Sequence, residues 1–238
     1  MRNSLRSAGA AGIAMMALAS WTPRLTAVEL PTIDQIADRY IKSMGGRAAL
    51  SQLGAVILTG RCDSSAPDES GSIEIAVKTP KVAFNQGGGN LRMGFDGESV
   101  WRATASEGLQ QRKGRQFAEL VTVFDPARAL WWKEWYPEMA VKGVQKAGDR
   151  ETWVLETLPG NPATERLFID RESGLLVREE VRPGIVFTFT DYRELNHANG
   201  VRAAFVVQQT AANGIVYTYR FEKIDPVPVV DEARFQPR

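Results

Sequence analysis

The sequence is poor in the residues from which most catalytic and metal sites are built. The chain of 238 residues contains one cysteine and one histidine. A single cysteine excludes an internal disulfide and a cysteine-rich metal site, and a single histidine excludes zinc sites made from several histidines. The formal net charge is +1, so no basic excess indicates nucleic-acid binding. We therefore expect no metal, no other cofactor and no nucleic-acid partner.

Catalytic motifs are also missing. The sequence has no H-E-x-x-H, no G-x-S-x-G, no P-loop and no C-x-x-C. His197 lies in the turn sequence ELNHANG and Cys62 in TGRCDSS, and neither has a partner in sequence that would activate it. No spacing selects a pair of carboxylates of the kind that glycosidases use, although two carboxylates facing a deep pocket would favour an enzyme. We expect a protein that is not an enzyme and has no catalytic residues.

Residues 1–27 have the pattern of an export signal. Two arginines within the first six residues precede the apolar run AGAAGIAMMALA, which ends in a small-x-small cleavage site at Ala19. Cleavage after Ala27 is the alternative. The run is shorter than the roughly 20 residues that cross a membrane, and no cysteine lies near for lipid attachment. We expect an exported, periplasmic protein without a lipid anchor, with a single domain at residues 28–238.

The segment PTIDQIADRYIKSMGG, residues 31–46, predicts an amphipathic helix. Thr32 and Gln35 have the spacing of a capping box, and a double glycine ends the segment. RAALSQLGA, which follows, predicts a second short helix. Apolar residues recur at helical spacing and form one stripe that must be buried against another element. This stripe consists of Ile33, Ile36, Ala37, Tyr40, Ile41 and Met44.

From Ala55 onward the apolar period changes from 3.6 to 2. Alternation of this kind indicates antiparallel strands with one covered face and one wetter face. In LFIDRESGLLVREEV, residues 167–181, Gly174 can adopt the positive φ that a hairpin turn requires. Turn signals separate roughly eleven strands in meander order. Two of the apolar rows are Ile185, Phe187 and Phe189, and Tyr217, Tyr219 and Phe221.

Residues 115–139, RQFAELVTVFDPARALWWKEWYPEM, interrupt the strand pattern. One helix is predicted through Phe117 and Phe124, and a second begins at Asp125-Pro126 with proline in its first position. The second helix ends in an aromatic cluster that either packs the helix on the sheet or gates an apolar cavity. The tryptophans of this cluster are Trp131, Trp132 and Trp135.

A sheet of this size must twist and curl, so it forms either a closed barrel or a half-barrel. A closed narrow barrel leaves no inner face on which two apolar helical segments could be buried, whereas a half-barrel does. We therefore predict a mainly β (α+β) fold, a single curled antiparallel sheet whose concave face is covered by helices.

Six segments carry a resemblance to a known family. They are IADRYIKSMGGRAALSQLGAVILTG, GFDGESVWR, KEWYPEMAVKGVQKAGDRETWVLETLPG, ERLFIDRESGLLVREE, TDYRELNHANGVRAAFVVQQ and FEKIDPVPVVDEARFQPR. Through them, residues 33–238 resemble exported proteins related to the outer-membrane lipoprotein-sorting proteins, the LolA-like superfamily. These motifs are turns, caps and core positions. The resemblance implies an open, curled antiparallel sheet, with helices on its concave side, that cradles acyl chains or other apolar groups.

On this resemblance we expect a periplasmic carrier that holds lipid or lipoprotein acyl chains, with outer-membrane lipoprotein sorting as one role. Its partners would be a lipid or acylated protein and an envelope membrane protein. The alternative is a protein-interaction or envelope-sensing module whose groove is filled by its own helices. A one-residue error in strand phase would exchange the two faces. The expected groove residues are Ile36, Tyr40, Met44, Trp131, Trp132, Trp135, Ile185, Phe187, Phe189, Tyr217, Tyr219 and Phe221.

Overall fold

The structure is a computed structural model that describes six stretches of the chain. They are residues 29–66, 68–87, 90–114, 118–160, 164–182 and 184–237. The expected export signal at residues 1–27, with both cleavage sites, lies outside these stretches, and so does Phe117. No helix within the described stretches is long and apolar enough to cross a membrane.

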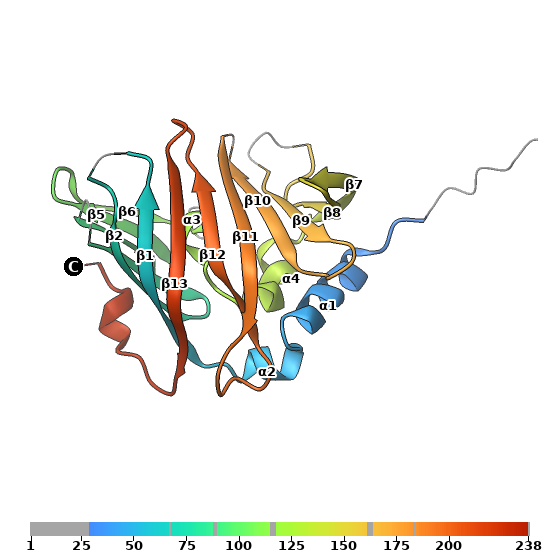
Figure 1. Cartoon of the computed structure of the whole chain (residues 1–238), viewed down its shortest axis with the longest axis horizontal. Coiled ribbons are helices and arrows are strands. Elements are labelled where there is room, and N and C mark those ends of the chain that lie inside the picture. Colours follow the sequence, from blue (N-terminus) through green and yellow to red (C-terminus); the bar gives the residue numbers. More distant parts are fainter. Residues whose placement is uncertain are drawn as a thin grey trace, which may run out of the picture.

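Thirteen strands form one antiparallel sheet, in the order β6-β5-β4-β3-β2-β1-β13-β12-β11-β10-β9-β8-β7 (Figure 1). Because β1 pairs with β13 at the centre, two meanders run outward to the edge strands β6 and β7. The predicted single curled sheet is confirmed, with thirteen strands instead of about eleven. The strands are β1 Ala55–Ser64, β2 Gly71–Lys78, β3 Lys81–Gln86, β4 Leu91–Phe95, β5 Ser99–Thr104, β6 Gly108–Lys113, β7 Ala140–Ala147, β8 Arg150–Glu156, β9 Arg166–Asp170, β10 Leu176–Arg182, β11 Ile185–Glu194, β12 Arg202–Thr210 and β13 Val216–Val227.

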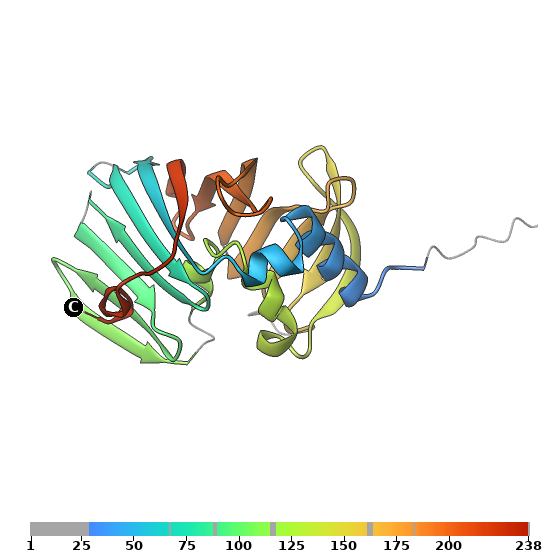
Figure 2. The same ribbon diagram turned by 90° about the horizontal axis from the view of Figure 1, so that it is seen from below.

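The helices are short apart from the first. They are α1 Ile33–Ser43, α2 Arg47–Ser51, α3 Glu119–Thr122, the 3-10 helix η3 Arg128–Trp131, α4 Trp132–Trp135 and the 3-10 helix η4 Glu232–Phe235. The capping box of α1 is confirmed: Thr32 Oγ1 accepts from Gln35 N–H at 3.2 Å, and Gln35 Oε1 accepts from Thr32 N–H at 2.8 Å. Seen from below, the sheet curves around α1, α2, α3 and α4 (Figure 2).

The inserted segment differs from its prediction. Helix α3 covers only 119–122, and the next helix begins at Arg128, two residues after Pro126. The reason is local, because the Asp125 carboxylate accepts the backbone N–H of Ala127 at 2.8 Å and holds residues 125–127 in a turn. The prediction of two helical elements in this segment is confirmed. Both elements are shorter than predicted, and the second begins at Arg128 and not at Pro126.

The hairpin between β9 and β10 is confirmed, and it docks on α1. Gly174 has φ 72°, and a Cβ added there would lie 2.6 Å from Ser43 Oγ, so glycine is required both for the turn and for the close approach. Ser43 Oγ donates to the carbonyl of Ser173 at 2.6 Å, and Arg39 donates to the carbonyl of Arg171 at 2.7 Å. The hairpin therefore fixes α1 on the concave side of the sheet.

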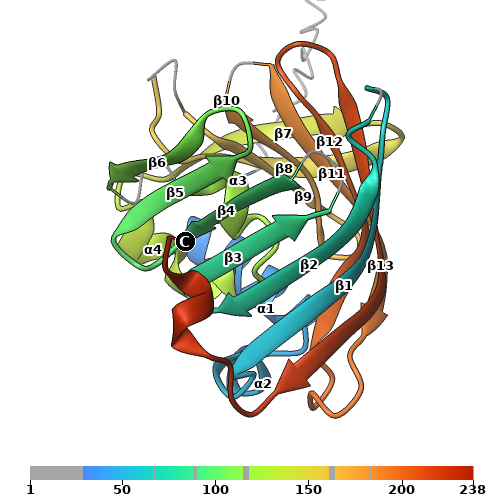
Figure 3. The ribbon, with the colours of Figure 1, turned by 90° about the vertical axis from the view of Figure 1, so that its left-hand side faces the viewer.

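Helix η4 lies on the opposite, outer face of the sheet (Figure 3). Small residues on β1, β2 and β3 leave room for it, and its Phe235 is fully buried against them. Trp101 of β5 donates its indole N–H to the Phe235 carbonyl at 2.8 Å. The C-terminal segment thus covers the outer face of the first meander and leaves the concave face to the other helices.

Candidate functional site

One half of the concave face is filled by helices. We call it the plugged half: the inner surface of β9, β10 and β11 together with α1, η3 and α4. Tyr40 of α1 stacks on Trp132 of α4 with ring centres 5.1 Å apart and planes 6° apart. Both side chains are buried, at 3% and 2% exposure. The plug is therefore a packed layer, in which α1 and the inserted segment hold each other in place.

A buried ion pair joins the plug to the sheet. Arg128 of η3 and Glu179 of β10 are 5% and 1% exposed. Arg128 Nη1 donates to Glu179 Oε1 at 2.9 Å, and Nη2 donates to Oε2, so the contact is bidentate. Burial alone would lower the pKa of Arg128, but the Glu179 carboxylate raises it above its ordinary value. The guanidinium therefore stays charged, and it needs Glu179 as its partner.

A second buried group, Asp125, joins the inserted segment to the turn between β2 and β3. Its Oδ1 accepts from Thr79 Oγ1 at 2.9 Å and from the Ala127 N–H. Its Oδ2 is buried with no hydrogen-bond partner. Burial raises the pKa of the Asp125 carboxyl from 3.8 to about 6. The inserted segment is therefore anchored on two sides, by Asp125 to the first meander and by Arg128 to the second.

The other half of the concave face contains an open cavity of about 310 Å³, which we call the outer cavity. It lies between α3, strands β3 to β5 and strands β12 to β13. This volume falls at the lower end of the roughly 300–1,000 Å³ of small-molecule sites. The lining residues are Glu69, Phe84, Gln86, Leu91, Met93, Arg102, Thr104, Leu120, Phe124, Gln209, Ala211, Tyr217 and Tyr219.

Polarity changes with depth in the outer cavity. Gln86 is the last residue of β3, and Tyr217 pairs with Ser64, the last residue of β1, so both lie at strand ends, which we call the mouth. Phe84 lies two residues before Gln86 on β3, and its cross-strand partner on β4 is Met93. The cavity is thus polar at its mouth and apolar at its inner end, which is an arrangement suited to an amphiphile.

Most polar groups at the mouth are paired within the protein. Tyr217 donates its hydroxyl hydrogen bond to the Glu69 carboxylate, and burial together with Glu69 raises the pKa of Tyr217 to about 12. Tyr219 donates to Gln209 Oε1 at 2.9 Å. Arg102 forms an ion pair with Glu107. The mouth therefore offers both hydrogen-bond donors and hydrogen-bond acceptors. It has no large excess of positive or negative charge.

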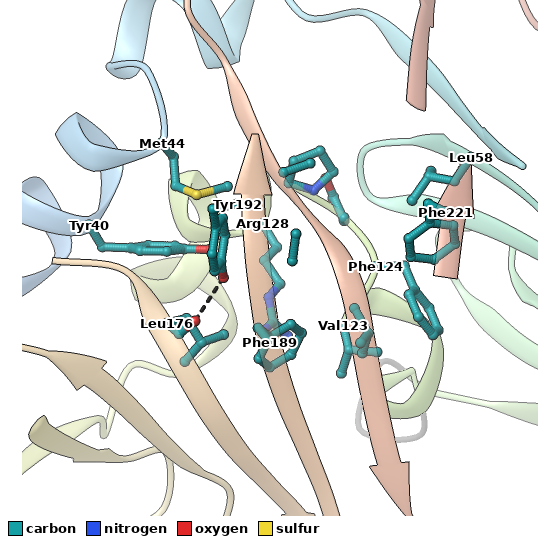
Figure 4. Close-up of a pocket in the computed structure, with 15 residues that line it drawn as sticks. Tyr40, Met44, Leu58, Val123, Phe124, Arg128, Leu176, Phe189, Tyr192 and Phe221 are labelled. Carbon is teal, nitrogen blue, oxygen red and sulfur yellow. Dashed lines mark hydrogen bonds between the residues drawn. The ribbon is translucent and has the colours of Figure 1, made fainter. Parts of the chain in front are cut away.

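A second, inner cavity of about 30 Å³ lies beside the plug (Figure 4). Phe124 lines both cavities. In the close-up, Phe124 and Phe221 lie on the side opposite Tyr40 and Met44. The inner cavity is lined by Tyr40, Met44, Leu58, Val123, Phe124, Asp125, Pro126, Arg128, Leu176, Phe189, Tyr192, Ala203, Ala204, Val207 and Phe221. Its volume is about that of one water molecule, so it holds no ligand as it stands.

The groove residues predicted from sequence fall into three groups. Tyr217 and Tyr219 line the outer cavity. Those that line the inner cavity are Tyr40, Met44, Phe189 and Phe221. The remaining residues line neither: Ile36, Trp132 and Phe187 are buried core, Trp135 and Ile185 are half-buried, and Trp131 is 37% exposed. Of the three tryptophans, Trp132 packs in the plug against Tyr40, and ligand contact by any of the predicted residues stays a prediction.

The sequence analysis did not predict the residues of the first meander that line the outer cavity, nor the two residues, Asp125 and Arg128, that anchor the inserted segment. Phe84 and Met93 belong to the first meander, whose concave row was not assigned. Arg128 is the one charge within the apolar run ARALWW, and Glu179 lies between Val177 and Val181 at the alternate positions of its strand, so each was visible as a charge at a position patterned for burial. Their pairing was hidden by a register shift in β10 between Leu176 and Arg178.

Comparison with known proteins gives matches at the level of structure. No protein-family model matches the chain, and no curated protein matches its sequence. A LolA superfamily protein from Nitrosomonas europaea is 12% identical, with a TM-score of 0.55, over 87% of this chain and 99% of that one. A proposed outer membrane lipoprotein-sorting protein domain from Vibrio parahaemolyticus is 13% identical, with a TM-score of 0.49, over 84% and 94% of the two chains. A DUF1329 family protein from Desulfovibrio piger is 8% identical, with a TM-score of 0.49, over 86% and 97%.

The Nitrosomonas europaea likeness extends over nearly the whole of that protein and over most of this chain. It agrees with the open sheet of thirteen strands and with the helices on its concave face. At this level of identity the likeness concerns the fold and not the ligand. The protein has a LolA-like fold.

Proposed function

We propose that the protein is an exported periplasmic carrier that holds one acyl chain, of a lipid or an acylated protein, in its outer cavity. The observation that carries this proposal is the cavity of about 310 Å³ with an apolar inner end and a polar mouth, on the concave side of a LolA-like sheet. Outer-membrane lipoprotein sorting is one role that such a carrier would serve.

The hydrophobic effect supplies enough free energy for this task. Each methylene removed from water contributes about 0.8 kcal/mol, so about ten methylenes contribute about 8 kcal/mol. Association and ordering of the chain offset part of this gain, which leaves a binding that is useful yet reversible. The volume supports one chain, because it is at the small end of ligand sites.

Release requires that the apolar wall move. Leu120 of α3 and Phe124 cover the outer cavity from the side opposite the sheet, and both belong to the inserted segment. This segment is held by Asp125 on one side and by the Arg128–Glu179 pair on the other. We propose that it acts as the lid of the carrier, with these two contacts as its closing points.

The plugged half favours a second function, a partner-binding or envelope-sensing module. There the inner cavity holds about 30 Å³ and the helices are fixed by a buried ion pair, so this half has no room for a ligand. In such a module the outer surface would bind a partner, and the outer cavity would stay unused.

Detergent-free purification from a periplasm, followed by native mass spectrometry and solvent extraction, separates the two functions. The carrier is expected to retain a lipid or acylated peptide. Met93→Trp, which fills the outer cavity, is expected to lose it. Leu109→Trp is the matched control, because Leu109 lies on the edge strand β6, is 51% exposed and does not line the outer cavity.

An unliganded mass for the wild-type protein, with no uptake of added lipid, would overturn the carrier proposal and favour the partner-binding module. Retention by Met93→Trp equal to that of Leu109→Trp would show that the lipid binds elsewhere.

A further inference from the structure

We infer that Phe124 is the end wall of the ligand site and sets the length of acyl chain that the outer cavity accepts. This inference rests on the proposed carrier function. In it, the polar end of the ligand lies at the mouth, near Gln209 and Tyr217, and the methyl end of the chain meets the Phe124 ring.

The Phe124 ring lies between the outer cavity and the inner cavity and separates the two. Among the residues that the structure describes, Phe124 alone lines both the outer and the inner cavity. The next cavity therefore begins directly behind the ring, so removing the ring would join the two spaces.

Neighbouring aromatic rings hold this partition in place. The Phe124 ring meets Tyr219 edge-on with centres 5.3 Å apart, and it meets Phe221 and Phe187 edge-on at 6.1 and 6.4 Å. It lies beside Phe84 at 5.9 Å. Contacts with strands on both meanders leave the ring little rotational freedom.

The backbone at Phe124 is also fixed. The next residue, Asp125, is tied to Thr79 Oγ1 at 2.9 Å and to the Ala127 N–H at 2.8 Å. While the lid is closed, a ring with an anchored backbone and packed aromatic neighbours makes a rigid stop for a chain. Small changes in the ring size should therefore change the accepted length.

The Phe124 ring also separates the acyl chain from charged side chains, which line the inner cavity behind it. Arg128 and Asp125 line the inner cavity, and both are nearly fully buried. A methyl group pushed against them would gain little, since it would contact groups that require polar partners. Phe124 thus keeps the acyl chain within the apolar part of the concave face and away from the anchors of the plug.

The polarity of the lining determines the orientation of the acyl chain in the outer cavity. Gln86, Gln209 and the Tyr217–Glu69 pair stand at the mouth, whereas Phe84 lies beside Phe124 and has Met93 as its cross-strand partner. An acyl chain with its polar end inward would bury that end among rings and leave methylenes in water. The opposite orientation satisfies both ends, and it is the one that we assign.

The first test is the affinity of a series of saturated fatty acids of increasing chain length, measured by calorimetry. For the wild-type protein, affinity should rise about fourfold per methylene, from about 0.8 kcal/mol each, until the chain reaches the wall, and then stop rising. In Phe124→Ala the rise should continue to longer chains, because the volume that the ring vacates and the apolar part of the inner-cavity lining, such as Met44 and Leu58, accept further methylenes away from the two charged groups. Phe124→Leu, which keeps an apolar side chain in the core, should give a smaller extension and serves if the alanine variant does not fold.

The second test locates the end of the chain with a fatty acid that carries a terminal diazirine, cross-linked by light and mapped by mass spectrometry. Wild-type labelling is expected at Met93 and Leu120. Phe124→Ala should shift labels to Tyr40 and Met44 of the inner cavity. Phe84→Ala is the control, because Phe84 lines only the outer of the two cavities and its loss should leave the labels in the outer cavity.

An unchanged length limit together with unchanged labels in both Phe124 variants would overturn the inference while leaving the carrier function intact. Absence of any fatty-acid binding by the wild-type protein would overturn both.

Discussion

The two halves of the concave face are made by the same curled sheet, yet they differ in what covers them. Over β9 to β11 the cover is a packed layer that includes α1 and carries a buried ion pair, and the space left beside it, which also borders β12 and β13, is about 30 Å³. Over β3 to β5 the cover is a single short helix, α3, and a cavity of about 310 Å³ remains. The helices, and not the curl of the sheet, therefore decide where space remains on the concave face.

The largest expected effect is on the anchor of the plugged half. Glu179→Met should lower the free energy of unfolding by about 3–5 kcal/mol, because it leaves the Arg128 charge buried without a partner. Replacing both residues with methionine should restore most of that loss. Urea denaturation measures both effects.

The exposed pair Arg47–Asp38 is the control for this prediction, with side chains 60% and 69% exposed. Asp38→Ala should change the unfolding free energy by less than about 1 kcal/mol. Equal losses for Asp38→Ala and Glu179→Met would show that the buried pair does not anchor the plug.

The second effect depends on pH and concerns Asp125. Burial raises its pKa from 3.8 to about 6, so between these values the folded protein holds a proton that the unfolded chain has released. The folded state therefore loses stability as pH rises from about 4 to 6, by about 3 kcal/mol, and the loss is complete above pH 6.

Asp125→Asn should remove this dependence, so the variant should gain stability relative to the wild-type protein as pH rises. Chemical denaturation at a series of pH values measures the difference between the two proteins. A difference that does not change with pH would contradict the burial of an ionisable carboxyl at this position.

The smallest expected effect is a loss of stability in the plugged half that leaves fatty-acid binding in the outer cavity unchanged. Thr32→Ala removes the cap of α1 and should cost about 1 kcal/mol in unfolding free energy. Because α1 belongs to the plugged half, the affinity for a fatty acid should stay unchanged, as measured by calorimetry. A loss of affinity as large as that caused by Met93→Trp would mean that the halves are not independent.

Local signals in the sequence were enough to predict the sheet, its hairpins and the first helix. The capping box at Thr32, the glycine of the 167–181 hairpin and the period-2 rows each depend on a few neighbouring residues, and each is confirmed. These features predicted an open, curled sheet with a helix on its inner side.

The site could not be predicted in the same way. Phe124 became a wall because the inserted segment ends α3 early and places its ring among three strands that are distant in sequence. The Arg128–Glu179 pair joins residues 51 positions apart, and the register shift in β10 changes which side chains face inward. Long-range packing decides these features, and no local pattern in the sequence encodes it.

We propose that the outer cavity binds an acyl chain while the plugged half stays closed. Hydrogen–deuterium exchange with and without a saturating fatty acid tests it most directly. We predict slower exchange in residues 81–87, 90–104 and 119–124, with no change in residues 33–43, 176–182 and 185–189. Slower or faster exchange centred on 33–43, 176–182 and 185–189, or no change anywhere, would contradict binding of the chain in the outer cavity.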